Sequence, residues 1–375
     1  MATVATPRPH DIAGPIRYDV DVDVAPAAPH WDAFVDRTPG GDHVQTSAWA
    51  RVKQVVGWRA VRVVVRGHGE VVGGCQLLIR DLPGAGAVGY APRGPLLADH
   101  DPHLLELLLD AVDAIASDHR LIALKLQPPP GGEWMTPVLE DRGYRASELD
   151  VAPVATVRID LGHDEAALLS DMRSGHRANI RKAPRKGVTV RAGTLDDIPA
   201  YMDVVRATAR RQGFPVYPAA YYEAMLRSFS DGDHARLVIA ELDGRVLAGV
   251  MVLAYGDGAM YKMGGWSGEP RNIHPNEPAH WDAIRWARER GYRYYDFEGI
   301  SPKYARALNA GLNPDPPERG DARFKLGFGG EVALLPGTYD FSYRPLRARA
   351  IQMAAGLVGR PAKLAYRLLG RTRRD

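Results

Sequence analysis

Two clusters of basic residues stand out in this 375-residue chain as side chains whose type and spacing could do chemistry. The segment from Arg173 to Arg191 holds seven arginines and lysines and no acidic residue, and a second excess of arginine fills residues 344–375. The net charge is only +3, so these local densities, more than the total, favour phosphate-bearing partners. A solvated helix face explains either cluster as well, so both interpretations stay open.

The common catalytic motifs are absent from the sequence. The twelve histidines show no HExxH or paired-cysteine spacing, even where His100 and His103 or His274 and His280 lie close together. No GxSxG elbow, Walker loop or GxGxxG between a strand and a helix occurs. We therefore expect no metal site and no bound cofactor.

An internal duplication indicates which elements must position the active residues. The segment VVVRGHGEVVGGCQLLI recurs as VIAELDGRVLAGVMVLA, and each copy places a glycine-containing turn between two apolar runs, which predicts a β-hairpin. The alignment pairs Val64 with Ile239, Gly69 with Gly244, Val71 with Val246 and Gly74 with Gly249. Tyr90 and Gly94 then correspond to Tyr261 and Gly265. A matched repeat predicts two similar lobes.

Each copy continues with a helical segment, His103–Ala116 or Asn276–Arg290, and a further strand. This order is similar to that of N-acetyltransferase (GNAT) lobes, so we predict an α/β fold with a tandem pair of such lobes, each a mixed sheet flanked by helices. In that fold a glycine-rich turn before the helix binds the coenzyme A pyrophosphate. The corresponding turns here, APRGPLLADHDPH and SGEPRNIHPNE, lack that glycine spacing, and prolines 270, 275 and 278 remove amides from the second turn.

Several motifs in order resemble the Fem family of aminoacyl-tRNA-dependent peptidyltransferases over residues 40–345. They are APRGPLL, RANIRKAPRKGV, WDAIRWARERGYRYYDFEGI and FKLGFGGEV. The resemblance implies transfer of an amino acid from a charged tRNA to an amine of a peptidoglycan precursor, nucleotide- or lipid-linked. The chain lacks a long coiled-coil insert and is therefore closer to the compact FemX type.

The resemblance also implies roles for particular residues. Lys325 in FKLGFG would serve the tRNA 3′ end and the charge that develops on the ester, and Phe324 could stack on a terminal base. For the acceptor, Lys53 matches a diphosphate-binding lysine and Arg211 is the best match for its arginine partner. A surface lysine beside a strand phenylalanine, and solvated side chains at positions 53 and 211, are the structural alternatives.

Three further residues are candidates for the same cleft. Arg93 lies in the rigid PRGP loop, and Tyr217 follows Arg211 closely. Asp296 ends the strand YYDFEG and could accept the proton of the attacking ammonium, although capping or pairing with an arginine is the alternative.

We predict a first lobe of residues 1–152 plus 331–375 and a second lobe of residues 153–330. Residues 301–323 are expected to form a loop, residues 324–345 strand, and Leu346–Leu369 a basic amphipathic helix that contacts anionic membrane or packs on the first lobe. The basic segment 173–191 could follow the acceptor stem of a tRNA. One cysteine, Cys75, and no apolar run of membrane-spanning length favour a cytoplasmic protein, and a peripheral position at the inner face of the membrane stays open.

Three alternatives remain from the sequence. The acceptor could be an antibiotic-like small molecule, the enzyme could be a coenzyme A-dependent N-acyltransferase, or the protein could be a non-catalytic RNA- or membrane-binding adaptor. The proline-rich turns disfavour the second.

Overall fold

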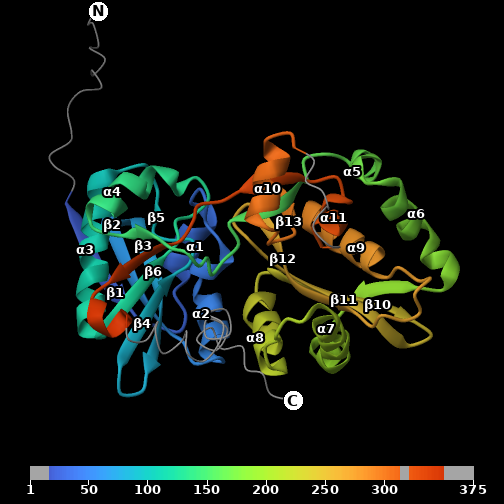
Figure 1. Ribbon diagram of the computed structural model, residues 1–375, viewed down its shortest axis with the longest axis horizontal. Coiled ribbons are helices and arrows are strands. Elements are labelled where there is room, and N and C mark those ends of the chain that lie inside the picture. The colour runs from blue at the N-terminus through green and yellow to red at the C-terminus, as the bar shows by residue number, and fades with distance from the viewer. Residues whose placement is uncertain (1–16, 313–320, 350–375) are drawn as a thin grey trace, which may run out of the picture.

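A computed structural model describes residues 17–312 and 321–349 of the chain. Two twisted mixed sheets stand side by side, each flanked by helices (Figure 1). The strand order is β1-β2-β3-β4-β6-β15-β7 in the first sheet, with the short β5 beside β3, and β14-β8-β13-β12-β11-β10-β9 in the second. The tandem pair of GNAT-like lobes predicted from the sequence is confirmed.

The first lobe carries its sheet between α3 on one face and α1 and α2 on the other. Its strands are β1 (Tyr18–Asp23), β2 (Arg59–Gly67), β3 (Glu70–Leu82), β4 (Gly86–Ala91), β5 (Leu96–Leu97), β6 (Leu121–Leu126), β7 (Arg145–Ala146) and β15 (Tyr339–Ser342). Its helices are α1 (Pro29–Arg37), α2 (Ser47–Gln54), α3 (Pro102–Asp118) and α4 (Thr136–Asp141).

The second lobe places α9 on one face of its sheet and α7 and α8 on the other. Its strands are β8 (Ala155–Asp160), β9 (Thr189–Ala192), β10 (Ala235–Leu242), β11 (Arg245–Tyr255), β12 (Gly258–Trp266), β13 (Tyr294–Asp296) and β14 (Glu331–Leu334). Its helices are α5 (Glu165–Asp171), α6 (Ser174–Lys182), α7 (Ile198–Gln212), α8 (Ala219–Ser230), α9 (Asn276–Glu289), α10 (Pro302–Asn309) and α11 (Asp321–Leu326).

The duplicated sequence forms equivalent hairpins, β2–β3 and β10–β11. Val64 pairs with Gly74 in one lobe and Ile239 with Gly249 in the other. These glycines are required by packing, because a Cβ at Gly74 would lie 2.4 Å from the Trp31 ring and a Cβ at Gly249 would lie 2.5 Å from the Tyr201 ring. The same device therefore lets α1 and α7 pack closely on their sheets.

One hydrophobic cluster joins the two lobes. It runs from Trp31 and Trp49 on α1 and α2 to Tyr221 and Phe229 on α8, through side chains that are all buried. The Tyr255 hydroxyl donates to the Asp32 carbonyl at 2.9 Å across the same boundary. Burial of apolar surface between the lobes favours a single rigid body.

Several predictions about local structure were wrong. The segment predicted as loop contains α10, whose N-cap is Ser301, and Phe324 and Lys325 lie on helix α11 and not on a strand. Elsewhere, the N-cap of α2 is Thr46, whose hydroxyl accepts the Trp49 amide. Helix α5 ends before Met172, where the Arg177 guanidinium binds the carbonyls of Ser170 and Met172.

The chain also returns to the first lobe later than residue 331. Strand β14 pairs with β8 in the second sheet, and only β15, beginning at Tyr339, pairs with β6 in the first. Cys75 is a buried, free thiol in β3, as expected. The predicted leader and the greater part of the predicted C-terminal basic helix lie outside the described residues.

Candidate functional site

A cavity of about 500 Å³ opens between the two lobes and contains most of the titratable residues that the sequence singled out. Its walls come from α2, the loop after β4 and the inter-lobe linker on one side, and from α8, β8, β12 and the end of β13 on the other. Of the predicted site residues, Lys53, Arg93, Tyr217 and Asp296 line it. Lys325, Phe324 and Arg211 do not.

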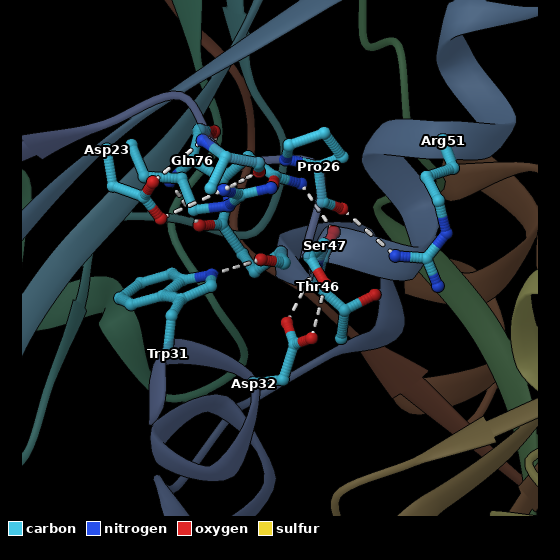
Figure 2. Close-up of polar contacts among 11 residues, drawn as sticks. Asp23, Pro26, Trp31, Asp32, Thr46, Ser47, Arg51 and Gln76 are labelled. Carbon is cyan, nitrogen blue, oxygen red and sulfur yellow. Dashed lines mark hydrogen bonds and ion pairs between the residues drawn. The ribbon is translucent and has the colours of Figure 1, made fainter. Parts of the chain in front are cut away.

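Helix α2 is fixed by a buried polar network in the first lobe (Figure 2). Arg62 is almost fully buried and donates to Gln76 at 2.8 Å and to Asp23 at 3.1 Å. Gln76 in turn donates to the Thr46 carbonyl at 2.9 Å, and Asp32 accepts the Ser47 amide at 2.7 Å (Figure 2). Since buried polar groups are costly unless paired, this network orients the start of α2 and hence the residues that α2 presents to the cavity.

The same network holds the loop that carries Arg93. The Gln45 amide donates to the Pro92 carbonyl at 2.6 Å, and Arg93 itself adopts a left-handed conformation with φ 50°. Arg93 is 6% exposed and donates Nη2 to the Pro153 carbonyl at 2.6 Å. Among the described residues its buried Nη1 has no hydrogen-bond partner. An anionic ligand group at this position would satisfy that donor.

Asp42 supplies negative charge beside Arg93. Burial opposes its ionisation, but the adjacent His43, the positive charge of Arg93 and the Val44 amide together hold the pKa of the Asp42 carboxyl well below its usual range. Asp42 Oδ1 lies 2.7 Å from His43 Nδ1. The carboxylate therefore stays charged and orients the cations around it.

Lys53 on α2 lies among aromatic rings. Its Nζ is 5.7 to 5.9 Å from the ring centroids of Trp49, Trp58, Tyr217 and Tyr221. Tyr217 and Tyr221 are stacked with centroids 3.9 Å apart. Lys53 is only 6% exposed, and aromatic faces of this kind stabilise a buried ammonium.

The second lobe contributes an open seam between two parallel strands. β12 pairs with β13 only over Gly258–Met260, after which β12 continues to Trp266 paired with β11 on its other side. Lys262 lies on this part of β12, forms an ion pair with Glu298, and has its Nζ 5.4 Å from the Trp49 ring centroid of the other lobe. The sequence analysis did not identify Lys262 or Glu298.

Asp296 lies at the end of β13 and is 4% exposed. Its carboxylate accepts hydrogen bonds from the Thr156 hydroxyl, from Arg158 Nε at 2.8 Å and from the Glu298 amide at 2.6 Å. Burial opposes the charge of Arg158, but Asp296 raises the pKa of that guanidinium above its ordinary value. The arginine pairing that the sequence left as an alternative for Asp296 is present.

Lys325 approaches the same strand end from the opposite face of the sheet. Its Nζ donates to the carbonyls of Glu298 at 3.0 Å and Gly299 at 2.6 Å and forms an ion pair with Asp321 at 2.9 Å. Glu298 has a left-handed φ of 48°, so Lys325 holds a strained turn in place. The Glu298 side chain extends from this turn into the cavity. The ammonium is 6% exposed and is not a solvated surface lysine.

Phe324 belongs to an aromatic cluster behind that turn. Its ring centroid lies 5.4 Å from that of His176, 5.6 Å from that of His280 and 5.3 Å from that of Phe328. His280 is fully enclosed, and burial, with the charges of Lys325 and His176, lowers its pKa to about 3. It therefore remains neutral and accepts or donates to the Tyr295 hydroxyl at 3.0 Å.

Arg211 lies at the end of α7, outside the cavity. Its guanidinium donates to the Trp266 carbonyl at 2.6 Å and to the Ser267 carbonyl at 3.2 Å, 5.2 Å from the Trp266 ring centroid. The proximity of Arg211 and Tyr217 in the sequence does not bring their functional groups to one site, because α7 ends between them.

Carboxylates occupy the helix N-termini where a GNAT lobe holds pyrophosphate. In the first lobe Asp101 accepts the amides of His103 and Leu104 at the start of α3. In the second, the buried Glu277 lies in the first turn of α9 and accepts from Asn179 at 2.8 Å. Negative charge at these positions opposes a bound diphosphate.

Within residues 17–312 and 321–349, no group of three or more His, Cys, Asp and Glu side chains is arranged to hold a metal ion. Within the same residues, no helix has the length and apolar content needed to span a membrane.

Comparisons with known proteins match both halves of the chain. The FemAB family model matches residues 27–133, and the acetyltransferase (GNAT) domain model matches residues 170–325. A lipid II:glycine glycyltransferase of Staphylococcus aureus is 23% identical over 345 residues, covering 72% of this chain and 82% of that protein.

Solved structures share the fold. The crystal structure of FemX superposes with a TM-score of 0.77 at 21% identity, covering 89% of this chain and 99% of FemX. The tandem GNAT protein of the clavulanic acid biosynthesis pathway has a TM-score of 0.52 at 15% identity and covers 86% of this chain and 98% of its own. L-PGS from Bacillus licheniformis has a TM-score of 0.52 at 14% identity, covering 89% and 98%.

Proposed function

Since the chain belongs to the Fem family, we propose that it transfers an amino acid from an aminoacyl-tRNA to an amine of a peptidoglycan precursor. The observation that carries this proposal is the inter-lobe cavity, in which buried cations of one lobe face a charged strand end of the other. The Staphylococcus aureus relative is named a lipid II:glycine glycyltransferase, an activity that belongs to the same reaction class.

The first lobe supplies the features expected of an acceptor site. Arg93 has a buried donor directed at no described partner, and Lys53 is an ammonium held among aromatic rings. A diphosphate of a nucleotide- or lipid-linked precursor would take hydrogen bonds from these cations. The stacked rings of Tyr217 and Tyr221 give the same cavity an apolar wall.

The second lobe supplies the features expected of the reacting centre. An aminoacyl ester is already activated, so attack by a neutral amine needs positioning and stabilisation of the oxyanion more than a protein nucleophile. Lys325 puts a buried positive charge on the Glu298–Gly299 turn, and Glu298 extends from that turn to Lys262 in the cavity. In this proposal the amine adds to the ester carbonyl, the tetrahedral oxyanion forms, and the ribose hydroxyl of the tRNA leaves with a proton.

The proton of the attacking ammonium must pass to a base. Asp296 was proposed for this role, but its three hydrogen bonds occupy both oxygens. Glu298 also lines the cavity, and within the part of the chain that the structure describes its carboxylate pairs with the Lys262 ammonium. We retain Asp296 as a candidate and add Glu298.

The test is a transfer assay with defined donors and acceptors. The protein is incubated with tRNAs charged with single amino acids, together with a UDP-linked or lipid-linked pentapeptide precursor or with free small amines, and the mass added to each product is read. We expect one aminoacyl residue on the precursor. Acylation from acetyl coenzyme A, or addition only to small amines, would contradict the proposal.

A further inference from the structure

The basic segment between Arg173 and Arg191 divides into two structural classes. Three of its cations are used within the protein: Arg177 binds carbonyls at the end of α5, Lys186 binds the Asn272 carbonyl, and Arg191 pairs with Asp197 at 2.7 Å. The other four are exposed and form no ion pair with any described residue. They are Arg173, Arg181, Lys182 and Arg185.

Helix α6 lies on the outside of the second lobe (Figure 1) and carries Arg181 and Lys182. Arg173 is its N-cap, and Arg185 lies in the short 3-10 helix that follows it. No residue of α6 is buried, and the half-buried Ile180 packs on the core formed with α9. A helix that lies in a membrane interface needs an exposed apolar face opposite its charges, and α6 presents none. Its exposed side is therefore suited to a polyanion that is bound through charge alone.

This charged side is continuous with the Lys325 helix. The Arg173 amide donates to the Gly327 carbonyl at 2.8 Å, and His176 Nε2 lies 3.1 Å from the Phe324 carbonyl. Arg323 on α11 is also exposed and forms no ion pair within the described residues. The cations thus extend from the helix that carries Lys325 along α6 to Arg185.

We propose that this basic strip, Arg323, Arg173, Arg181, Lys182 and Arg185, binds the phosphate backbone of the RNA whose 3′ end is delivered to the Lys325 side of the second lobe. The inference rests on the proposed function, because it assigns a surface to the donor. Phosphate contacts of this kind supply affinity and orientation without reading base sequence. The acceptor cavity and the RNA surface would then lie on opposite faces of the second sheet.

The faces can be assigned from β10. Val238 and Ala240 pack in the cluster with α9, whereas Leu237 and Ile239 pack in the cluster with α7 and α8. Helix α6 contacts α9, and α8 lines the cavity. A charge reversal on α7 and α8 is therefore a control on the face away from the strip.

The test compares Arg181→Glu/Lys182→Glu with the charge-matched control Arg206→Glu/Arg227→Glu, whose residues are exposed on α7 and α8. Binding of uncharged tRNA is measured by fluorescence anisotropy at several salt concentrations. We expect the α6 variant to lose about tenfold or more in affinity and its log–log salt slope to fall by about 2, since each phosphate contact contributes about 1. The control should keep the affinity and slope of the unmodified protein.

Transfer assays then distinguish an effect on tRNA binding at α6 from an effect on the transfer reaction itself. The donors are a full-length aminoacyl-tRNA and a dinucleotide carrying the same aminoacyl ester, which cannot reach α6. We expect the α6 variant to lose kcat/KM with the tRNA and to retain it with the dinucleotide.

Equal losses with both donors, or unchanged tRNA binding, would overturn the proposal for α6 while leaving the proposed function intact. Failure of the unmodified protein to transfer from either donor would overturn the proposed function, whereas the anisotropy result would still decide the surface. If the α6 variant loses binding to vesicles containing anionic lipid but still binds tRNA, the strip is assigned to a membrane and the RNA proposal is rejected.

Discussion

The two lobes share a strand order but differ at one seam. In the first lobe β4 pairs with the parallel β6 over its length, from Ala87 to Ala91. In the second lobe β12 pairs with β13 only from Gly258 to Met260 and then separates from it. The closed seam makes a scaffold, and the open seam exposes backbone and charged side chains where a ligand can approach.

The strand next to the seam differs as well. β12 runs unbroken beside β11, whereas its counterpart is divided into β4 and β5, both paired with β3. The interruption contains Arg93 in its left-handed conformation. In the first lobe a rigid loop therefore interrupts the strand, and this loop places the Arg93 side chain in the cavity.

The helices behind the two sheets show a third difference. The buried residues of α3 are all apolar, but α9 buries Glu277, His280 and two tryptophans. Buried polar groups are costly unless paired, and in the second lobe these groups lie behind the sheet whose strand end holds the proposed reacting centre. Three predictions test this division of labour.

The largest expected effect follows from Lys325→Ala. Removing the ammonium takes a positive charge from the Glu298–Gly299 turn and leaves two carbonyls without their donor. We expect kcat for transfer to fall by about 100-fold, as for loss of a group that stabilises an oxyanion, with little change in acceptor KM. Single-turnover transfer measures this, and Lys303→Ala on the exposed side of α10 is the control. An unchanged rate would remove Lys325 from the mechanism.

A smaller effect is expected from Lys53→Met, and it should appear in the acceptor KM and not in kcat. The methionine keeps the contact with the surrounding rings but removes the charge. The KM for a diphosphate-bearing acceptor should rise by about tenfold, because a charge-assisted hydrogen bond is lost, while kcat changes little. An acceptor truncated before its phosphates provides the control. The same rise in KM for both acceptors would refute the assignment.

The smallest effect on transfer at neutral pH is expected from the third prediction, which concerns the acid stability of the second lobe. The pKa of His280, about 3, lies below the ordinary value of 6.5. Between these two pH values the unfolded chain therefore binds a proton at His280 and the folded chain does not. The free energy of unfolding should therefore fall as the pH drops from about 6.5 towards 3, by at most about 1.4 kcal/mol per pH unit. Urea titrations at several pH values should show a flatter dependence for His280→Phe.

The control for this prediction is His119→Gln in the first lobe. Burial and Arg59 also lower the pKa of His119, but this ring lies near the surface, where solvent screens the effect. We expect its pH dependence to match that of the unmodified protein. Identical curves for all three proteins would show that His280 does not contribute to acid sensitivity.

The sequence predicted the fold because the repeat is carried by local signals. His68-Gly69 and Asp243-Gly244 both form turns with positive φ, and the apolar runs on either side of each turn pair as antiparallel strands. The break in β4, the helix at Phe324 and the position of β14 depend on long-range packing, which no local pattern encodes.

The candidate site was predicted in part for the same reason. Lys53 and Arg93 lie in distinctive motifs, but Lys262 and Glu298 are single charged residues whose importance arises only from the separation of β12 and β13. Arg211 was chosen as the best match for an arginine of the resembling family, and the end of α7 turns its side chain onto the Trp266 backbone. The position of a charged side chain therefore depends on where the neighbouring helix or strand ends.

Strand β15 has a consequence for the way the molecule is made. It is inserted between β6 and β7, so the first sheet is finished by residues that the ribosome produces after the entire second lobe. Until Tyr339–Ser342 leave the exit tunnel, the growing polypeptide presents β6 with an unpaired rim, a site where chaperones or neighbouring nascent chains can attach. The first sheet therefore gains its β15 strand only after the second lobe has been synthesised.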